Sequence, residues 1–393
     1  MHASDITEIH RALAPAREKL LERDDDIVAA QLEVTEIPAP TGDEGARARW
    51  IEGQFRALAL DEVHIDAAGN VVGTRVGQHR DSAVVVCAHL DTVFPRDAVG
   101  RARREHGRIF APGIGDNGRG LAALLALAHA IDGHTVRTRR PVRFVATTGE
   151  EGDGDLRGAK HHFAHHPAAA AVALDGTGDE RVVHRAVGSR RFRVSIDGPG
   201  GHSWSDFGTA NPLHAAAAAI DRLVSTALPD EPRTSLSVTR ASAGLSVNSI
   251  PPTAWFEVDI RSTGPHPLAH LAAALDAIVG GAVSDANTAR RPRSAPLSST
   301  ITLIGDRPCG ELPASEPLLE IACAATRLVG RMPELATAST DANIPLALGI
   351  PAIAIGAGGL GGDVHTTSEW FENDAGARGI ARALTIVVAA AGR

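Results

Sequence analysis

The chain contains a short, uninterrupted apolar run, residues 84–88, that leads directly into His89. A run of this length is typical of a strand that is buried on both faces, as in the parallel sheets of α/β proteins. Such sheets bind ligands outside the carboxyl ends of their strands. The pattern therefore predicts an α/β fold in which His89, and Asp91 two residues later, lie at a ligand-binding edge of the sheet.

Two further apolar runs end in acidic residues. Residues 142–148 lead into Glu150 and Glu151, and residues 168–174 lead into Asp175. Parallel strands present their carboxyl ends at one edge, so we expect these carboxylates to lie near the imidazole that follows the first strand. The alternative interpretations are a solvated acidic pair at Glu150 and Glu151 and a turn or cap residue at Asp175.

Two more candidate residues belong to glycine-rich segments. Asp116 lies in the turn Gly-Ile-Gly-Asp-Asn-Gly, directly before an apolar helix expected over residues 121–131. Its alternative role is an N-cap for that helix. His365 follows the glycine-rich residues 356–362, which are not followed at once by the helix that a dinucleotide-binding loop requires.

Length and composition exclude several classes of protein. At 393 residues the chain is too long for one ordinary core, which predicts two domains. Its net charge of −8 and aromatic content of 3% argue against binding to nucleic acid or anionic membranes. Three cysteines are too few for a disulfide framework, and the first residues lack the apolar segment of a secretory signal. We therefore expect a soluble, cytoplasmic protein.

The pattern of apolar residues changes after about residue 187. The expected elements are a strand, a helix, two strands, a helix and a strand, at residues 191–196, 211–228, 235–239, 255–261, 268–279 and 301–304. This βαββαβ order is ferredoxin-like. The first pattern then returns, so a domain of residues 1–186 and 307–393 is expected to carry residues 187–306 as an insertion.

Local signals give three further expectations. Residues 5–36 have helical periodicity, which Pro15 is expected to split or kink. Thr41 and Glu44 match a capping box at the start of a following helix. Residues 280–297 are polar and basic and are expected to form a loose connection.

The candidate side chains form a set that suits divalent metal ions. The set comprises His89, Asp91, Asp116, Glu150, Glu151, Asp175 and His365. Imidazoles with several carboxylates favour Zn²⁺, with Mn²⁺ or Co²⁺ also compatible, over Cu⁺ or an iron–sulfur cluster. Carboxylates that converge without a cation repel one another, and two ions that share a bridging carboxylate remove this repulsion.

Together these motifs resemble the M20 metallopeptidases, the group of carboxypeptidase G, aminoacylase, succinyl-diaminopimelate desuccinylase and peptidase T. The resemblance covers nearly the whole chain. It rests on His-Leu-Asp-Thr-Val from residue 89, Gly-Ile-Gly-Asp-Asn from residue 113, Gly-Glu-Glu-Gly from residue 149, the inserted domain and the late His365. It implies a zinc-exopeptidase-like catalytic domain with a mixed central sheet flanked by helices, and an inserted lid or dimerisation domain.

The resemblance also implies a role for each candidate residue in the catalytic domain. His89 and Asp175 would hold one metal ion. Glu151 and His365 would hold the second, and Asp116 would bridge the two.

Two further residues would act beside the metal ions. Glu150 would be the general base, taking a proton from the metal-bridging water and passing it to the leaving amine. Asp91 would orient His89 and fix its tautomer.

The inserted domain adds three candidates by the same resemblance. His202 would reach the site of a neighbouring subunit and stabilise the oxyanion of the reaction. Asn248 would contact the substrate, and Arg261 would bind a substrate carboxylate with its guanidinium. The alternatives are a surface-loop histidine, a turn asparagine and a solvated strand arginine.

The sequence thus predicts a two-metal hydrolase of amide bonds in dipeptides, short peptides or N-acyl amino acids, assembled as a homodimer through the lid. One alternative is an N-acyl or N-carbamoyl amino acid amidohydrolase without peptidase activity. Another is a related binding protein that has lost catalysis, which the complete set of ligands and base disfavours. Neither nucleic acid nor a membrane is an expected partner.

Overall fold

The chain folds into two units, which the computed structural model describes from residue 3 to residue 393. Unit 1 comprises Met1–Ala186 and Glu311–Arg393, and unit 2 comprises Val187–Gly310. Unit 2 is therefore an insertion between two segments of unit 1, and its sheet begins and ends at neighbouring residues, because Ser189 pairs with Arg307.

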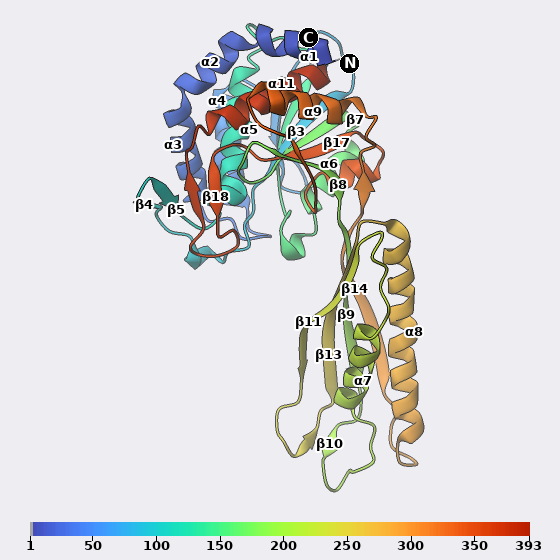
Figure 1. Ribbon diagram of the computed structural model, residues 1–393. Coiled ribbons are helices and arrows are strands. Elements are labelled where there is room, and N and C mark those ends of the chain that lie inside the picture. Colours follow the sequence, from blue (N-terminus) through green and yellow to red (C-terminus); the bar gives the residue numbers. More distant parts are fainter. Residues whose placement is uncertain (1–2) are drawn as a thin grey trace. The chain divides into compact units, whose positions relative to one another are not determined.

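The centre of unit 1 is a nine-stranded mixed sheet (Figure 1). Its strands, in spatial order, are β1 (Asp61–Ile65), β2 (Val71–Arg75), β6 (Val142–Thr147), β3 (Ala83–His89), β7 (Ala168–Leu174), β17 (Ala352–Ile355), β8 (Arg181–Ala186) and β15 (Gly310–Glu311), with β16 (Glu334–Ala338) beside β8. The strand β3 is parallel to both β6 and β7, and β17 is parallel to β7. These four buried strands therefore end at the same edge, as the apolar runs predicted.

Helices flank this sheet. The apolar helix α5 (Gly120–Ala130) packs against β3, and α11 (Ala377–Ala391) packs against both α5 and β3. The remaining helices of unit 1 are α1 (Ala3–Ala12), α2 (Ala14–Glu22), α3 (Asp24–Thr35), α4 (Gly45–Ala57), α6 (Arg157–His165), α9 (Pro317–Leu328) and α10 (Asn343–Ala347). The expected mixed sheet with flanking helices is confirmed.

Short elements complete unit 1. Three helical turns are η1 (Arg96–Ala98), η2 (Ile114–Arg119) and η3 (Gly152–Gly154). A small separate sheet contains β18 (Leu360–Gly362), β19 (Trp370–Glu372), β5 (Arg108–Phe110) and β4 (Arg103–Glu105). This sheet joins the segment before η2 to the segment after His365, so two parts of the chain that are distant in sequence meet there.

Unit 2 has the predicted βαββαβ order. Its elements are β9 (Gly188–Asp197), α7 (Pro212–Val224), β11 (Thr234–Ala243), β13 (Thr253–Ser262), α8 (Pro265–Ala289) and β14 (Ser298–Arg307), with the short pair β10 (Gly201–His202) and β12 (Ser249–Ile250). The sheet order is β11-β13-β9-β14. Phe256, Val258 and Ile260 are buried on the face of β13 that α7 and α8 cover, because successive side chains of a strand alternate between faces.

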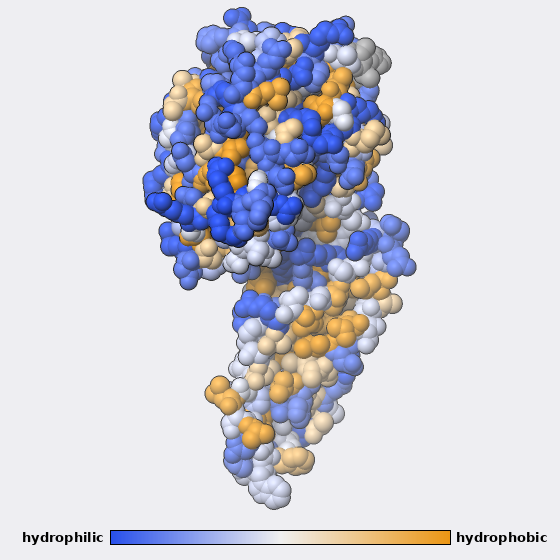
Figure 2. All heavy atoms as spheres, turned by 60° about the vertical axis from the view of Figure 1, so that its left-hand side comes forward, coloured by the Kyte–Doolittle hydropathy of each residue, from blue (hydrophilic) through white to orange (hydrophobic). Residues whose placement is uncertain are grey.

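Hydrophobic side chains also lie on the outer surface of unit 2 (Figure 2). Trp204, Phe207, Leu245 and Val247 are among the most exposed apolar residues of the described chain. All four belong to the loops around β10 and β12, outside the packed helix-and-sheet core.

One local expectation was confirmed: residues 5–36 are helical, and the break between α1 and α2 lies next to Pro15, which occupies the first turn of α2, where its missing N–H costs no hydrogen bond. Two others were wrong. Residues 280–289 continue α8 as its last turns, because Val283 and its neighbours still pack on the sheet. The capping box does not form: Thr41 donates to Asp91, and Glu44 accepts from the loops beside it.

The helix α8 is also the one described helix whose length and composition would allow it to cross a membrane. Its buried residues, among them Leu268, Leu271, Leu275 and Val279, belong to the core of unit 2. Packing within the unit therefore buries one face of this apolar stretch.

We expect Leu124→Ala to lower the free energy of unfolding of unit 1 by about 2–5 kcal/mol, because it leaves a cavity in the core. Leu124 is fully buried in α5. Urea denaturation followed by circular dichroism measures the change. The control is Leu21→Ala in α2, where the side chain is 55% exposed and a change within about 0.5 kcal/mol is expected. Equal destabilisation by both changes would contradict this assignment of the core.

Candidate metal centre

Side chains from three neighbouring strand ends meet at the carboxyl edge of the unit 1 sheet. His89 is the last residue of β3 and is almost fully buried. Glu150 and Glu151 follow β6 and are also buried. Asp175 follows β7 directly, and its main-chain N–H donates to the carbonyl of Ile355 at the end of β17.

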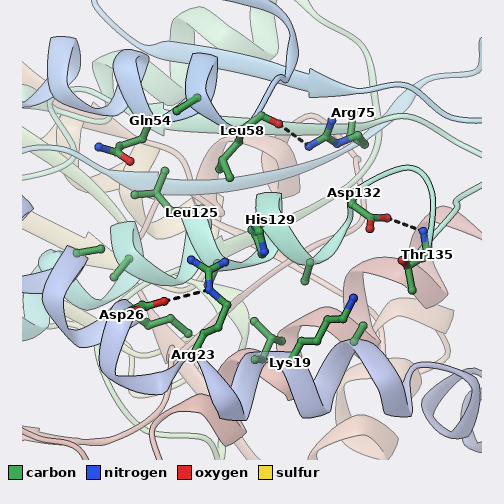
Figure 3. A pocket seen from close by; sticks show the side chains of 18 of the residues that line it. Lys19, Arg23, Asp26, Gln54, Leu58, Arg75, Leu125, His129, Asp132 and Thr135 are labelled. Atoms are coloured by element: carbon green, nitrogen blue, oxygen red, sulfur yellow. Dashed lines mark hydrogen bonds and ion pairs between the residues drawn. The ribbon is translucent and has the colours of Figure 1, made fainter.

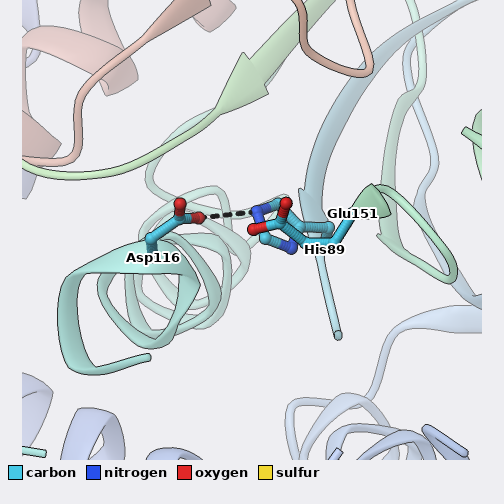
Figure 4. A group of neighbouring side chains, drawn as sticks. All are labelled: His89, Asp116 and Glu151. Carbon is cyan, nitrogen blue, oxygen red and sulfur yellow. Dashed lines mark hydrogen bonds and ion pairs between the residues drawn. The ribbon is translucent and has the colours of Figure 1, made fainter. Parts of the chain in front are cut away.

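Asp116 comes to this edge from the irregular turn η2, which leads into α5. Its Oδ1 lies 2.9 Å from Nε2 of His89. Figure 4 shows the two side chains pointing toward each other, with Glu151 beside His89. One ligand atom from each of these three residues lies within 4.8 Å of the other two, a spacing that allows them to share a metal ion.

His365 reaches the same cluster from the glycine-rich loop near the end of the chain. Its Nε2 lies 2.9 Å from Oε1 of Glu151 and 3.2 Å from Oδ2 of Asp116. Asp116 therefore contacts a different imidazole with each carboxylate oxygen. Asp116 thus lies between the two imidazoles, 2.9 Å from Nε2 of His89 and 3.2 Å from Nε2 of His365.

The pKa values of the cluster show how strongly its charges interact. Hydrogen bonds to Asp116 and Glu151 raise the pKa of His365 to about 10. Burial alone would lower the pKa of His89, but its hydrogen bonds to Asp116 and Asp91 outweigh this effect and raise it well above the ordinary value. Burial, together with the negative charge of Asp116, raises the pKa of Asp175 to about 7.

These residues fit divalent metal ions. The four carboxylates of Asp116, Glu150, Glu151 and Asp175 outnumber the two imidazoles, so even two protonated histidines would not neutralise them. Burial, and after it the negative charge of Asp116, raises the pKa of Asp175, as expected for a carboxylate buried among others. Divalent cations would keep all four carboxylates ionised and take the place of the protons on the histidines.

Asp91 supports the cluster mainly through hydrogen bonds that involve main-chain groups. Its Oδ1 accepts from the N–H of Glu150 at 2.9 Å, and its Oδ2 accepts from the N–H of Glu151 at 3.0 Å. Nδ1 of His89 lies 3.0 Å from the carbonyl oxygen of Asp91 and 3.7 Å from its carboxylate. Because a carbonyl only accepts, Nδ1 of His89 donates and Nε2 faces Asp116. The expected orienting role thus falls to the carbonyl, and the carboxylate positions Glu150 and Glu151.

Glu369 is a supporting residue that the sequence patterns did not reveal. It is fully buried, and its carboxylate accepts from the N–H groups of Gly113, Gly115 and Asp116 at 2.8–2.9 Å. Burial raises the pKa of Glu369 to about 7, although these three hydrogen bonds oppose the shift. The side chain fixes the turn that presents Asp116. Its one sequence signal is an acidic residue four positions after His365.

Glu44 and Arg47 were also missed as parts of the site's support. Oε1 of Glu44 accepts from the N–H of Gly149, immediately before the acidic pair, and from Arg157. Arg47 is fully buried and donates to the carbonyl of Leu90, next to His89, at 2.6 Å. Both residues thus fix the loops that follow β3 and β6 by hydrogen bonds. Their position in a stretch of sequence with a helical pattern did not indicate this role.

The three candidates in unit 2 lie at two places. His202 and Asn248 are neighbours, because His202 pairs with Ser249 and the N–H of Ser203 donates to the carbonyl of Asn248. Both are exposed. Arg261 lies near the other end of β13, where its Nε donates to Asp259 at 2.8 Å. Unit 2 therefore brings the first two together and keeps the third apart.

Glu369→Gln is expected to loosen the turn of Asp116, because one carboxylate oxygen becomes an NH₂ group that faces a main-chain N–H. The predicted effects are a loss of about 1–3 kcal/mol in the free energy of unfolding and about 10–100-fold weaker metal binding. Denaturation and titration calorimetry measure them. Glu372→Gln, on the neighbouring half-exposed glutamate that pairs with Arg108, is the control and should change neither quantity. A variant at residue 369 that behaves like this control would refute the supporting role.

Comparison with known proteins gives one family. The model described as Peptidase family M20/M25/M40 matches residues 85–389, which is most of the chain and spans every candidate ligand. Among curated proteins, succinyl-diaminopimelate desuccinylase of Corynebacterium glutamicum is 27% identical over 246 residues, covering 60% of this chain and 66% of that protein. The match thus spans slightly less than two thirds of that relative.

Solved structures agree on the fold. A tripeptidase from Staphylococcus aureus has a TM-score of 0.76 and 22% identity, with 93% of this chain and 98% of that chain covered. A dinuclear metal-binding peptidase of the M20 family from Bacillus subtilis has a TM-score of 0.68 and 15% identity, with 95% and 99% covered. At these identities the similarity establishes the architecture.

Proposed function

We propose, from the premise that the chain belongs to peptidase family M20/M25/M40, that it is a metal-dependent hydrolase of amide bonds. Its substrates would be dipeptides, short peptides or N-acyl amino acids. The observation that carries the proposal is the contact of Asp116 with both His89 and His365, beside the buried Glu150 and Glu151. A related protein without catalytic function would have no need to retain this complete set.

The proposed metal ions are two, most simply Zn²⁺, with Mn²⁺ or Co²⁺ also compatible with these ligands. His89 and Asp175 would hold one ion, and Glu151 and His365 the other, with Asp116 shared between them. The contacts of Asp116 and Glu151 with His365, and of Asp116 with His89, support this division. Bound divalent ions would supply Lewis-acid chemistry, polarising the amide carbonyl and making a water molecule acidic enough to react at neutral pH.

Glu150 would transfer a proton from the attacking water to the leaving amide nitrogen. Its main chain is held by Asp91, and its side chain is buried at the same edge as the ligands. In this role the carboxylate takes a proton from the attacking water as the water oxygen bonds to the carbonyl carbon. It then gives that proton to the amide nitrogen as the C–N bond breaks, so one carboxylate serves first as base and then as acid.

The substrate class follows from two sources. The relatives described above include a desuccinylase and a tripeptidase, so both acyl groups and peptides belong to the proposal. Arg261 would bind the carboxylate of the substrate, as a guanidinium does in a bidentate pair. An N-acyl or N-carbamoyl amino acid amidohydrolase without peptidase activity is the second candidate, because this activity and peptide hydrolysis would use the same metal ligands and the same base.

Glu150→Ala should lower kcat by about 10²–10⁴-fold, because the proton transfer loses its carboxylate, and should leave metal binding intact. The assay is turnover by zinc- and manganese-loaded protein of a panel of dipeptides, tripeptides and N-acyl amino acids. The exposed Glu180→Gln is the matched control, since this side chain is 45% exposed in an ion pair with Arg331. An unchanged kcat in the Glu150 variant would refute its role, and a wild-type protein inactive on the whole panel would refute the function.

We further propose that the enzyme is a cytoplasmic homodimer, assembled through unit 2, in which His202 serves the site of the partner. The exposed position of His202 on the β10–β12 pair and the free state of Cys87, Cys309 and Cys323 are consistent with this view.

Co-expression of Glu150→Ala and His202→Ala subunits tests the shared site. A mixed dimer then has one site with both Glu150 and the partner's His202, so about a quarter of wild-type activity should return. Each variant alone should be nearly inactive. Light scattering should give a dimer in each case. A mixture without recovered activity, or an active monomer, would rule out the shared site.

Metal binding should release protons at neutral pH. The pKa of His365 is raised to about 10, so this imidazole is protonated at pH 7 until a metal ion displaces the proton. Affinity for Mn²⁺ should therefore fall as the pH falls, by about tenfold per unit for each proton released. Calorimetric titrations in two buffers of different ionisation enthalpy count the protons. Equal heats in both buffers would contradict the assignment.

A further inference from the structure

Unit 1 contains a cavity of about 610 Å³ that is separate from the metal centre (Figure 3). It lies between α2, α3, the end of α4 and α5. The helix α5 contributes Ala122, Leu125, Ala126, His129 and Ala130 to it, and none of the candidate metal ligands is among its lining residues. The volume is that of a typical small-molecule site.

The floor of the cavity is apolar. Leu20, Ile27, Leu125 and Ala126 line it and are each less than 9% exposed. Residues 122, 125, 126 and 129 belong to one face of α5, because positions three, four and seven apart share a face of a helix. This floor suits the hydrocarbon part of a ligand.

The rim of the cavity is basic. Lys19 belongs to α2, and Arg23 is the residue that directly follows this helix. Both residues are exposed. His129 lies between Arg23 and Leu58 in Figure 3. Burial lowers the pKa of His129, and the positive charges of Arg23, Lys19 and Arg75 lower it further, against the opposing charge of Asp132. The cations of the rim are therefore Lys19, Arg23 and Arg75.

Arg75 adds a charge that no carboxylate contacts directly within the described residues. Its guanidinium donates to the carbonyls of Leu58, Ala59, Ala128 and Ile131, at the carboxyl ends of α4 and α5. Arg75 thus links the ends of α4 and α5 beside the cavity, and it contributes a positive charge to the cavity.

The two acidic residues of the cavity are already engaged. Asp26 pairs with Arg23 at 3.2 Å at the solvent-exposed rim, where such a pair contributes little. Oδ1 of Asp132 accepts from the N–H groups of His134, Thr135 and Val136. The three cations Lys19, Arg23 and Arg75 outnumber these two carboxylates, although the charge of Asp132 acts on Arg75, so the rim keeps an excess of positive charge over an apolar floor.

We propose that this cavity binds a small amphipathic carboxylate, with its aliphatic part on the floor of Leu20, Ile27 and Leu125 and its carboxylate between Lys19 and Arg23. Charge complementarity and the apolar floor together select this class over a purely ionic or purely apolar ligand. Two sources have this chemistry: a free fatty acid, and an apolar amino acid derivative such as the amide hydrolysis proposed above would consume.

Titration calorimetry on the metal-loaded, full-length protein tests the site with four probes. They are sodium octanoate, N-acetyl-leucine, inorganic phosphate and octan-1-ol. We expect at least one of the two carboxylates to bind, with affinity at least about tenfold higher than that of phosphate or octanol, which each lack half of the chemistry. Octanoate alone identifies the fatty acid source, and N-acetyl-leucine alone identifies the amino acid source.

Variants locate the binding on this cavity. Lys19→Gln with Arg23→Gln should weaken carboxylate binding by at least about tenfold. Arg80→Gln with Arg101→Gln removes the same charge from exposed positions elsewhere in unit 1 and should leave affinity unchanged. Ala30→Trp fills the cavity from α3 and should abolish binding, with thermal unfolding as the check that the variant folds.

Three results would overturn the proposal. They are the absence of binding by both carboxylates, equal binding by phosphate or octanol, and carboxylate binding that survives both the charge variant and Ala30→Trp. The last result would place the ligand at the metal centre or elsewhere.

Discussion

Mutual repulsion among the carboxylates at the carboxyl edge of the unit 1 sheet is the constraint on which the rest of the site depends. Asp116, Glu150, Glu151 and Asp175 meet there with two imidazoles. Burial and the charge of Asp116 raise the pKa of Asp175, and hydrogen bonds to Asp116 and Glu151 raise the pKa of His365. A chain holds such a group together only if rigid elements position each member and cations compensate the charge.

Buried carboxylates that accept main-chain hydrogen bonds provide the rigidity. Asp91 fixes Glu150 and Glu151, Glu44 fixes the residue before them, and Glu369 fixes the turn of Asp116. Each support comes from a different segment of the chain than the loop it holds. The metal centre is therefore a product of the folded unit, and its loops depend on contacts between residues up to about 250 positions apart.

The parts of the site that sequence predicts are those with a local signal. The runs before His89 and Asp175 form strands at the expected places because an uninterrupted apolar run can only be buried on both faces. The capping box failed because Asp91 competes successfully for the hydroxyl of Thr41. Glu369 could not be predicted, since the three N–H groups that it binds come close to its side chain only when β19 pairs with β5. Tertiary partners, which leave no periodic pattern, decided the last two of these cases.

Anomalous diffraction from zinc-loaded crystals would locate the metal ions directly. Two peaks are expected at the edge of the unit 1 sheet, with Asp116 bound to both ions. The first ion would also contact His89 and Asp175, and the second would contact Glu151 and His365. A single ion, or zinc bound without Asp116, would contradict the two-metal centre on which the proposed hydrolysis rests.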